Sequence, residues 1–282
     1  MSGPIILGAV LLVIYVPTAL LTPQPLLDLR LFRERNFWAG NLLIWLGTVG
    51  LFGASFLLPQ YRQNLRGLDP YPAGLDLLPM GVAAMVSTVL IGRLYNRIDP
   101  RLIIAAGALG LAVDTYLIGQ WSTLTSAFAA LTPLLILRGL AIPPLVQTAN
   151  TVALQNIAGP ALSGATTLVT VTRNLVSSLA VAALTTILQT QTIVHDVNLS
   201  AQVHLSNPAT SALYNHLVAT FSGQGLSLQQ AQNAALQQLV SQVNSQATAL
   251  AYQDVYMLTT LVLVPAITLP ILLRTRRAAV QG

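Results

Sequence analysis

The sequence contains no cysteine and no lysine, and its three histidines, His195, His204 and His216, stand nine and twelve residues apart. Without cysteine there can be no disulfide, thiol nucleophile or thiolate metal site. Without lysine there can be no Schiff base and no Walker-type phosphate loop. The histidine spacings match no metal-ligand pattern, and no Ser/His/Asp signature is present. The sequence therefore predicts a protein that is not an enzyme and that holds no metal or other cofactor.

Charge of either sign is also scarce. Charged residues make up 7% of the 282 positions and hydrophobic residues 54%, whereas ordinary soluble domains carry roughly 25% charged residues. This composition argues against a soluble globular protein. The net charge of +5 comes from arginines that stand in small clusters between apolar stretches, so it indicates a membrane protein rather than a partner for nucleic acid.

Long apolar stretches dominate what remains. A helix needs about 20 apolar residues to cross a hydrocarbon core of about 30 Å. Seven stretches approach or exceed that length, at 5–21, 37–59, 73–92, 102–121, 128–152, 163–189 and 255–273. The sequence thus predicts an all-α integral membrane protein with seven transmembrane helices. The first stretch lacks the basic start and the cleavage site of a signal peptide, so we expect it to be retained.

The arginines predict how these helices are oriented. Three clusters follow the first, third and seventh stretches, and they consist of Arg30, Arg33, Arg35, Arg93, Arg97, Arg101, Arg274, Arg276 and Arg277. Those positions fall on one side of the membrane, and the positive-inside rule makes that side the cytoplasm. We therefore expect a cell-membrane protein with its N-terminus outside and its C-terminal tail, 274–282, in the cytoplasm.

The segment 190–252 is then a loop on the outer face. Asn207-Pro208 and Ser227-Leu228-Gln229-Gln230 are typical helix starts. An apolar stripe that begins at Leu228 follows the second of them. The segment is predicted to form a small helical hairpin that lies on the outer face, with its histidines in solvent.

Three charged residues fall deep inside predicted spans. Asp114, Arg138 and Arg173 each lie about 15–18 Å from a membrane surface at the helical rise. Charges at this depth are expensive and often mark transport pathways, but an opposite pair can also simply hold helices together. Asp114 is expected to pair with one of the two arginines, and both roles remain open.

Other polar residues lie within spans or near their ends. Asp76 and Asp254 are close to the predicted outer ends of their helices, where a carboxylate suits the positive end of the helix dipole. Asn41 and Asn174 are uncharged groups that can line a cavity or bond across helices. The candidate residues for a substrate or proton pathway are Asn41, Asp76, Asp114, Arg138, Arg173 and Asn174.

Several of these segments resemble one family. The segment 25–37, the run Leu57–Tyr61, the helix opening at 73–79 and the pair Arg138-Gly139 are similar to the C-terminal half of fourteen-helix drug:proton antiporters. These transporters are a branch of the major facilitator superfamily. The segment 92–101 resembles the superfamily's short cytoplasmic loop motif, although Asn96 and Asp99 depart from its pattern. Arg173 and its neighbours resemble the arginine-bearing helix of the family, but where that helix has glycines this chain has Ser177, Ser178 and Ala180.

The resemblance implies an organisation. Residues 1–36 form a linker transmembrane helix with a cytoplasmic loop, and residues 37–273 form a six-helix half-transporter. The segment 92–101 then acts in gating, through Gly92, Arg93, Arg97, Asp99 and Arg101.

The resemblance also implies a function. The chain would be a component of a proton-coupled antiporter that exports hydrophobic or amphiphilic compounds. Its partners would be the lipid bilayer, the small substrate, protons, and an N-terminal half-transporter or a second copy of itself. The alternative from another class is a membrane protein with no transport of its own, either a truncated remnant or a scaffold.

Overall fold

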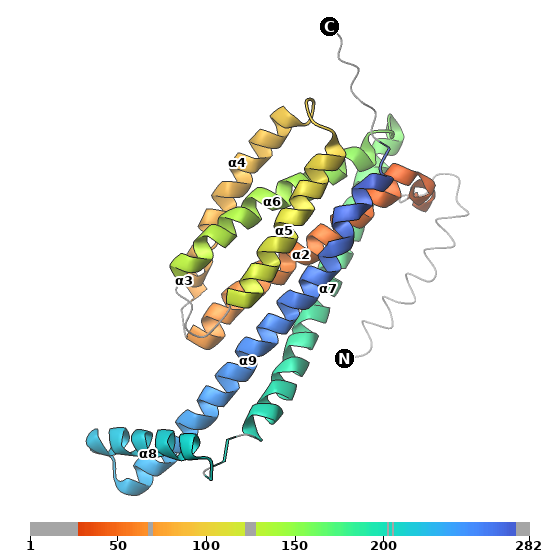
Figure 1. Cartoon of the computed structure of the whole chain (residues 1–282). Helices are drawn as coiled ribbons and strands as arrows, with labels where there is room; N and C mark the ends of the chain where they lie inside the picture. The colour runs from red at the N-terminus through yellow and green to blue at the C-terminus, as the bar shows by residue number, and fades with distance from the viewer. Residues whose placement is uncertain (1–27, 67–69, 122–127, 202, 205, 275–282) are drawn as a thin grey trace.

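The computed structural model describes residues 28–66, 70–121, 128–201, 203–204 and 206–274, and all of its regular elements there are helical (Figure 1). The first predicted span, 5–21, and the last two arginines lie outside the described residues. The elements are η1 Leu29–Arg33, α2 Arg35–Arg66, α3 Pro70–Leu75, α4 Leu78–Leu94, α5 Pro100–Trp121, α6 Phe128–Leu154, α7 Pro160–Ser200, α8 Pro208–Gly223, α9 Leu228–Thr268 and η2 Leu269–Leu272.

Six of these helices form a bundle. Helix α6 packs against α5, α4 and α2, while α9 packs against α5, α7 and α2. Within the described residues five helices are long and apolar enough to cross a membrane, namely α2, α5, α6, α7 and α9. The chain is therefore an all-α membrane protein, as its composition predicts.

The third predicted span differs from the expectation. The stretch 73–92 is not one helix, because α3 ends at Leu75 and α4 begins only at Leu78. Pro79, in the first turn of α4, has no N–H and suits a helix start. Asp76 lies in the break, just before the start of α4. The apolar run alone could not reveal this interruption, because every residue from Leu77 to Ala84 except proline and glycine is apolar.

Hydrogen bonds join three distant segments at one end of the bundle. The N–H of Arg274 donates to Asn36 Oδ1 at 2.7 Å, and Asn36 Nδ2 donates to the carbonyl of Arg274 at 2.8 Å. Asn156 Nδ2 donates to Glu34 Oε1 at 2.8 Å, while the other oxygen of Glu34 accepts from the N–H of Phe37 at the start of α2. The α4–α5 connection lies at this same end (Figure 1). We call it the arginine-rich end, and it gathers the three segments that charge bias assigns to one compartment.

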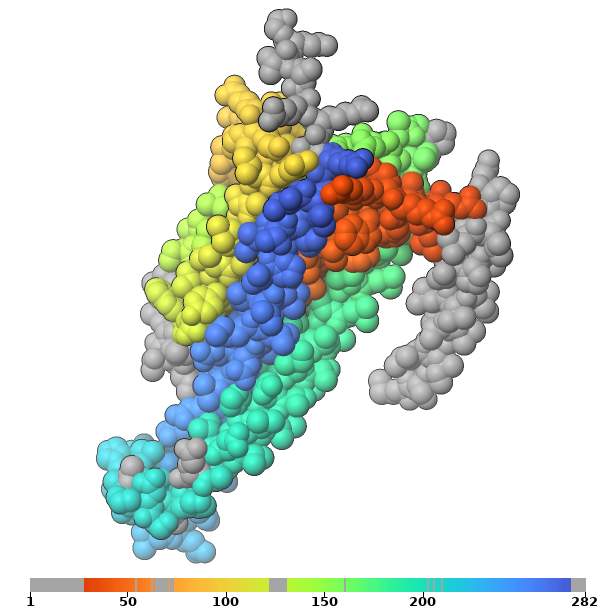
Figure 2. All heavy atoms as spheres, turned by 45° about the vertical axis from the view of Figure 1, so that its right-hand side comes forward, coloured from red at the N-terminus to blue at the C-terminus, as the bar shows by residue number. Residues whose placement is uncertain are grey.

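The opposite end of the molecule, which we call the α8 end, projects away from the bundle. Helices α7 and α9 are each 41 residues long, and they continue past the bundle to α8 (Figures 1 and 2). Within 190–252, α8 packs against α9, and the ends of α7 and α9 extend the two adjoining spans without a break. The position of this segment on the outer face stays a prediction. Its helix starts are confirmed: α8 begins at Pro208, and Ser227 and Gln230 form a capping box.

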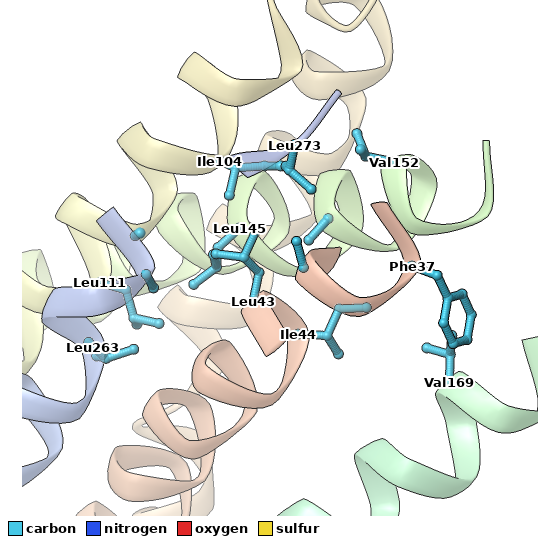
Figure 3. Close-up of a cluster of buried hydrophobic side chains, with 14 of the residues drawn as sticks. Phe37, Leu43, Ile44, Ile104, Leu111, Leu145, Val152, Val169, Leu263 and Leu273 are labelled. Atoms are coloured by element: carbon cyan, nitrogen blue, oxygen red, sulfur yellow. The ribbon is translucent and has the colours of Figure 1, made fainter. Parts of the chain in front are cut away.

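The buried apolar side chains form two clusters along the bundle. One cluster joins α2, α5, α6, α7 and α9 towards the arginine-rich end and includes Phe37, Leu111, Leu145 and Leu263 (Figure 3). The other cluster lies towards the α8 end and includes Leu57, Ile118, Leu135 and Tyr252.

Close helix crossings are made possible by glycine. A Cβ added to Gly107 on α5 would lie 2.6 Å from the backbone N of Leu145 and 2.8 Å from the carbonyl O of Ala141, both on α6. A Cβ added to Gly139 on α6 would meet the backbone carbonyl of Met80 and would lie 2.7 Å from the Cβ of Ala83. Small residues therefore serve tight packing at these two crossings, as they do between membrane helices in general.

Candidate functional site

A buried ion pair joins α5 and α6. Arg138 Nε donates to Asp114 Oδ2 at 2.7 Å, and both side chains are 0% exposed. The expectation that Asp114 pairs with an arginine is confirmed, and the partner is Arg138 rather than Arg173. Both residues lie within apolar helices, so this contact lets two costly charges neutralise each other.

The rest of the Arg138 guanidinium is also satisfied. Its Nη1 donates to the carbonyl of Gly50 at 3.0 Å and its Nη2 donates to Thr115 Oγ1 at 2.9 Å. Thr115 Oγ1 in turn donates to the carbonyl of Leu111 at 2.8 Å. One side chain on α6 therefore bonds to α5 and α2 together, so the network ties three helices.

This network forms a polar layer between the two apolar clusters. On α2, Gly50 lies between Ile44 of one cluster and Leu57 of the other. On α6, Arg138 lies between Ala141 and Leu135, and on α5 the pair Asp114-Thr115 has the same intermediate position. Asp114 Oδ1 finds no hydrogen-bond partner among the described residues. A charged, hydrogen-bonded layer between two apolar clusters is suited to fixing how the helices pack.

Asn41 and Arg138 are both buried. Each is 0% exposed inside this bundle, and their place on a substrate or proton pathway stays a prediction. Asn41 Nδ2 donates to the carbonyl of Phe37 at 2.9 Å in its own helix. Counting residues along a span predicts the depth of a side chain but not the direction in which the helix turns it.

Arg173 and Asn174 have the opposite environment. Both are exposed on α7, the candidate span with the smallest buried share. Six further polar residues recur at helical spacing along the same stretch of α7, and all but Ser177, which is partly buried, are exposed: Ser163, Thr166, Thr167, Thr170, Ser177 and Ser178. This polar face of α7 lies opposite the buried Ala165, Leu168 and Val169, by the 3.6-residue period.

Hydrogen bonding shows how the hydroxyls of this face are accommodated. Thr166 donates to the carbonyl of Leu162 at 2.8 Å, and Thr170 donates to the carbonyl of Thr166 at 2.9 Å. Ser177 and Ser178 both donate to the carbonyl of Asn174. These bonds satisfy the hydroxyl protons, whereas the side chains of Arg173 and Asn174 remain available to a ligand or to water.

A hydrogen bond between side chains of α7 and α9 lies where the two helices leave the bundle. His195 Nε2 is 2.7 Å from Asp254 Oδ2, with the two side chains 25% and 45% exposed. This corrects two expectations, that Asp254 is a solvated helix start and that His195 is merely solvated. Helix α9 runs without interruption through Asp254, which lies 26 residues after Leu228. Because the pairing joins residues 59 positions apart, sequence spacing carried no signal for it.

The comparisons with known proteins agree with this all-α membrane architecture. The family model of the Major Facilitator Superfamily matches residues 1–181, which is more than half of the sequence. The chain belongs to the major facilitator superfamily. The match includes α2, α4, α5, α6 and the first half of α7, so both the polar layer and the polar face of α7 lie within it.

Several curated superfamily members are similar to this chain. It is 30% identical over 223 residues to the multidrug export protein EmrB of Escherichia coli, covering 78% of this chain and 42% of that protein. It is 24% identical over 274 residues to the uncharacterized transporter YhcA of Bacillus subtilis, covering 97% of this chain and 51% of that protein. It is 33% identical over 127 residues to the methyl viologen resistance protein SmvA of Salmonella typhimurium, covering 43% of this chain and 26% of that protein. The chain thus spans about half, or less, of the length of these relatives.

The segment predicted to act in gating, 92–101, connects α4 to α5 in this superfamily member. Gly92, Arg93 and Arg97 are exposed, and Arg101 is partly buried. The N–H of Arg101 donates to Asp99 Oδ1 at 2.9 Å, which caps the first turn of α5. Burial of the neighbouring Tyr95 raises the pKa of its phenol. The connection is a short, positively charged turn, and its gating role remains a prediction.

Proposed function

We propose that this chain forms one half of a major facilitator exporter for hydrophobic or amphiphilic compounds. Export would be coupled to protons, and the other half would be an N-terminal half-transporter or a second copy of this chain. The polar face of α7 is the observation that carries the proposal. It places Arg173 and Asn174 on the outside of a bundle in which the ion pair Asp114–Arg138 is fully enclosed.

The physical argument is the cost of leaving that face in lipid. An arginine at the bilayer centre costs about 2.5–3.5 kcal/mol by insertion measurements, and the neighbouring hydroxyl and amide groups add to it. Association with another half removes this face from lipid. Transporters of this architecture bind substrate near the midplane at the interface of two repeats. An exposed polar face at that depth suits one wall of such a cavity.

Transport by purified protein tests the proposal. The chain is reconstituted into liposomes with an imposed pH gradient and a fluorescent cationic dye, and its oligomeric state is determined by cross-linking. We expect gradient-driven dye accumulation only where the chain is paired with a second copy or with a co-expressed N-terminal half. Accumulation by a preparation that is monomeric would contradict the proposal, and no transport in either assembly would support the remnant or scaffold alternative.

Variants on α7 test directly whether its polar face forms a wall of the substrate cavity. Arg173→Met combined with Asn174→Leu removes the polar groups that are available to substrate, so we expect loss of dye transport with an unchanged unfolding temperature. Leu175→Ala is a matched control, since Leu175 is also exposed on α7 but lies off the polar face. Equal transport by the double variant and by this control would show that the polar face takes no part.

The orientation has its own test. Because the chain has no cysteine, Ser206→Cys between α7 and α8 and Asn96→Cys between α4 and α5 each introduce a single thiol. Both native side chains are exposed, at opposite ends of the bundle. A membrane-impermeant thiol reagent applied to intact cells is expected to label position 206 and to leave position 96 unlabelled. Labelling of position 96 alone, or of both positions equally, would reverse or refute the predicted orientation.

A further inference from the structure

An apolar groove lies between α4 and α5 near their connection. Its volume is about 460 Å³, and α6 contributes Leu140 and Pro144 to its wall. The α4 side includes Leu90 and Leu94, which lie one helical turn apart on one face of that helix. The polar side chain in the wall is Ser87, whose hydroxyl already donates to the carbonyl of Leu140 at 2.8 Å. The wall therefore offers a ligand apolar contact and no side-chain hydrogen bond.

The groove is open to the surroundings of the bundle. Leu94 is 37% exposed, Leu90 45% and Leu102 64%, so large apolar side chains at its rim are left uncovered. Along α4 the groove runs from Ser87 to Leu94, which corresponds to about 10 Å at the helical rise. An apolar groove of this length can hold part of a hydrocarbon chain.

The mouth of the groove carries positive charge. Three lining residues, Leu94, Ile98 and Leu102, mark its end at the α4–α5 connection. Each of them directly follows an arginine in the sequence, and these arginines are Arg93, Arg97 and Arg101. Within residues 92–101 the one carboxylate is Asp99, so the connection carries a net charge of +2.

Arg101 has an unused donor. Its Nε is buried and finds no hydrogen-bond partner within the described part of the chain. The hydrogen bond to Asp99 uses only the backbone N–H of Arg101. A buried guanidinium N–H without an acceptor is unfavourable, and a phosphate oxygen is an acceptor that suits its geometry. Arg101 is not itself part of the groove wall, but it directly precedes Leu102, which is, so an anion bound to it would lie beside the end of the groove.

We propose that the α4–α5 groove is a binding site for an anionic phospholipid. One acyl chain lies along Leu90 and Leu94, and the phosphate is bound by Arg101 with support from Arg93 and Arg97. Basic pockets between membrane helices at the cytoplasmic side are a recognised way of holding anionic headgroups. Arginine binds phosphate through paired N–H donors, which explains why three arginines rather than apolar residues stand at the mouth. A bound lipid would hold the α4–α5 connection against both helices.

The test compares two lipids that have the same acyl chains but an anionic or a zwitterionic headgroup. The full chain in detergent is titrated with phosphatidylglycerol or with phosphatidylcholine of identical acyl chains, and bound lipid is counted by native mass spectrometry. We expect phosphatidylglycerol to bind at least about tenfold more tightly. Arg101→Gln is expected to abolish this preference, and Ala106→Trp, which fills the groove, to reduce the binding of both lipids. The control Arg33→Gln removes an exposed arginine at the same end of the molecule but outside the groove, and should bind as the parent does.

The proposal would be overturned if the two lipids bound with equal affinity, or if Arg101→Gln kept the preference for phosphatidylglycerol. It would also be overturned if Arg33→Gln lost that preference as fully as Arg101→Gln does. A fourth contrary outcome is that glycerol phosphate, which has no acyl chain, binds as tightly as phosphatidylglycerol. Cross-linking from Leu102→Cys to a second protein in native membranes would likewise show that a protein covers the groove. The circular dichroism of each variant is compared with that of the parent, so that loss of lipid is read only from folded protein. The readout is binding, so the result stands apart from whether the chain transports.

Discussion

Replacing Asp114 with alanine is expected to lower the free energy of unfolding by about 3–5 kcal/mol. The change leaves the Arg138 guanidinium fully buried and without its carboxylate, while its bonds to Gly50 and Thr115 cannot neutralise the charge. Arg138→Ala should cost a similar amount, because it leaves the carboxylate alone in the interior. The measurement is reversible unfolding in mixed detergent micelles, followed by circular dichroism.

A double variant separates the pair from its two members. Asp114→Leu with Arg138→Met removes both charges and keeps apolar volume, so it should recover much of the stability lost by either single change. Asp254→Ala is the matched control. It breaks the partly exposed pair with His195, and such pairs contribute about 0–1 kcal/mol. If the double variant is as unstable as the sum of its singles, the two side chains do not act as a pair.

The second large effect is expected at a helix crossing. Gly139→Ala should destabilise the fold by about 1–3 kcal/mol, because the added methyl group would meet the backbone of α4 at Met80, which cannot turn aside as a side chain can. The same unfolding measurement applies. Gly139→Leu should prevent α4 from packing against α6 and should expose α4 to limited proteolysis.

The matched control is another glycine within a helix. Gly81 lies on α4, and a Cβ built there has nothing within 4 Å. Gly81→Ala is therefore expected to be neutral or to stabilise by about 0.4–1 kcal/mol, since alanine restricts the unfolded chain. Equal effects at the two positions would mean that helix propensity, and not the close approach of α4, decides the cost at Gly139.

The general architecture could be predicted because its physical causes are local in the sequence. Apolar length predicted both ends of α5 and α6 to within two residues, whereas α2 continues seven residues beyond its predicted end. Polar capping groups predicted the starts of α8 and α9. Counting residues from the end of each span gave the depth of its charged side chains in the membrane. Asp114 could therefore be predicted to pair with an arginine at a similar depth. Which arginine it meets depends on the rotation of α6 and α7 about their axes, and that is decided by packing between helices.

The features that the sequence did not reveal are all non-local. The pair His195–Asp254 depends on α7 and α9 continuing side by side beyond the bundle. Glutamine and asparagine are frequent in the first half of α9, and this polarity indicated a separate loop although the helix continues. The polar face of α7 did have a local signal in the sequence, because serine and threonine recur there at helical spacing.

The polar layer also bears on how the helices find their alignment during assembly. Apolar contacts between membrane helices change little when one helix slides along another by a turn, about 5.4 Å. The hydrogen bonds of Arg138 are different, because they form at one alignment of α6 with α5 and α2. A one-turn slip along α5 would carry the guanidinium from Asp114 and Thr115 to Ile118 or to Leu111, and neither residue can neutralise its charge. The polar layer thus fixes the register of α6 relative to α5 and α2, as a lone buried polar residue fixes the register of a coiled coil.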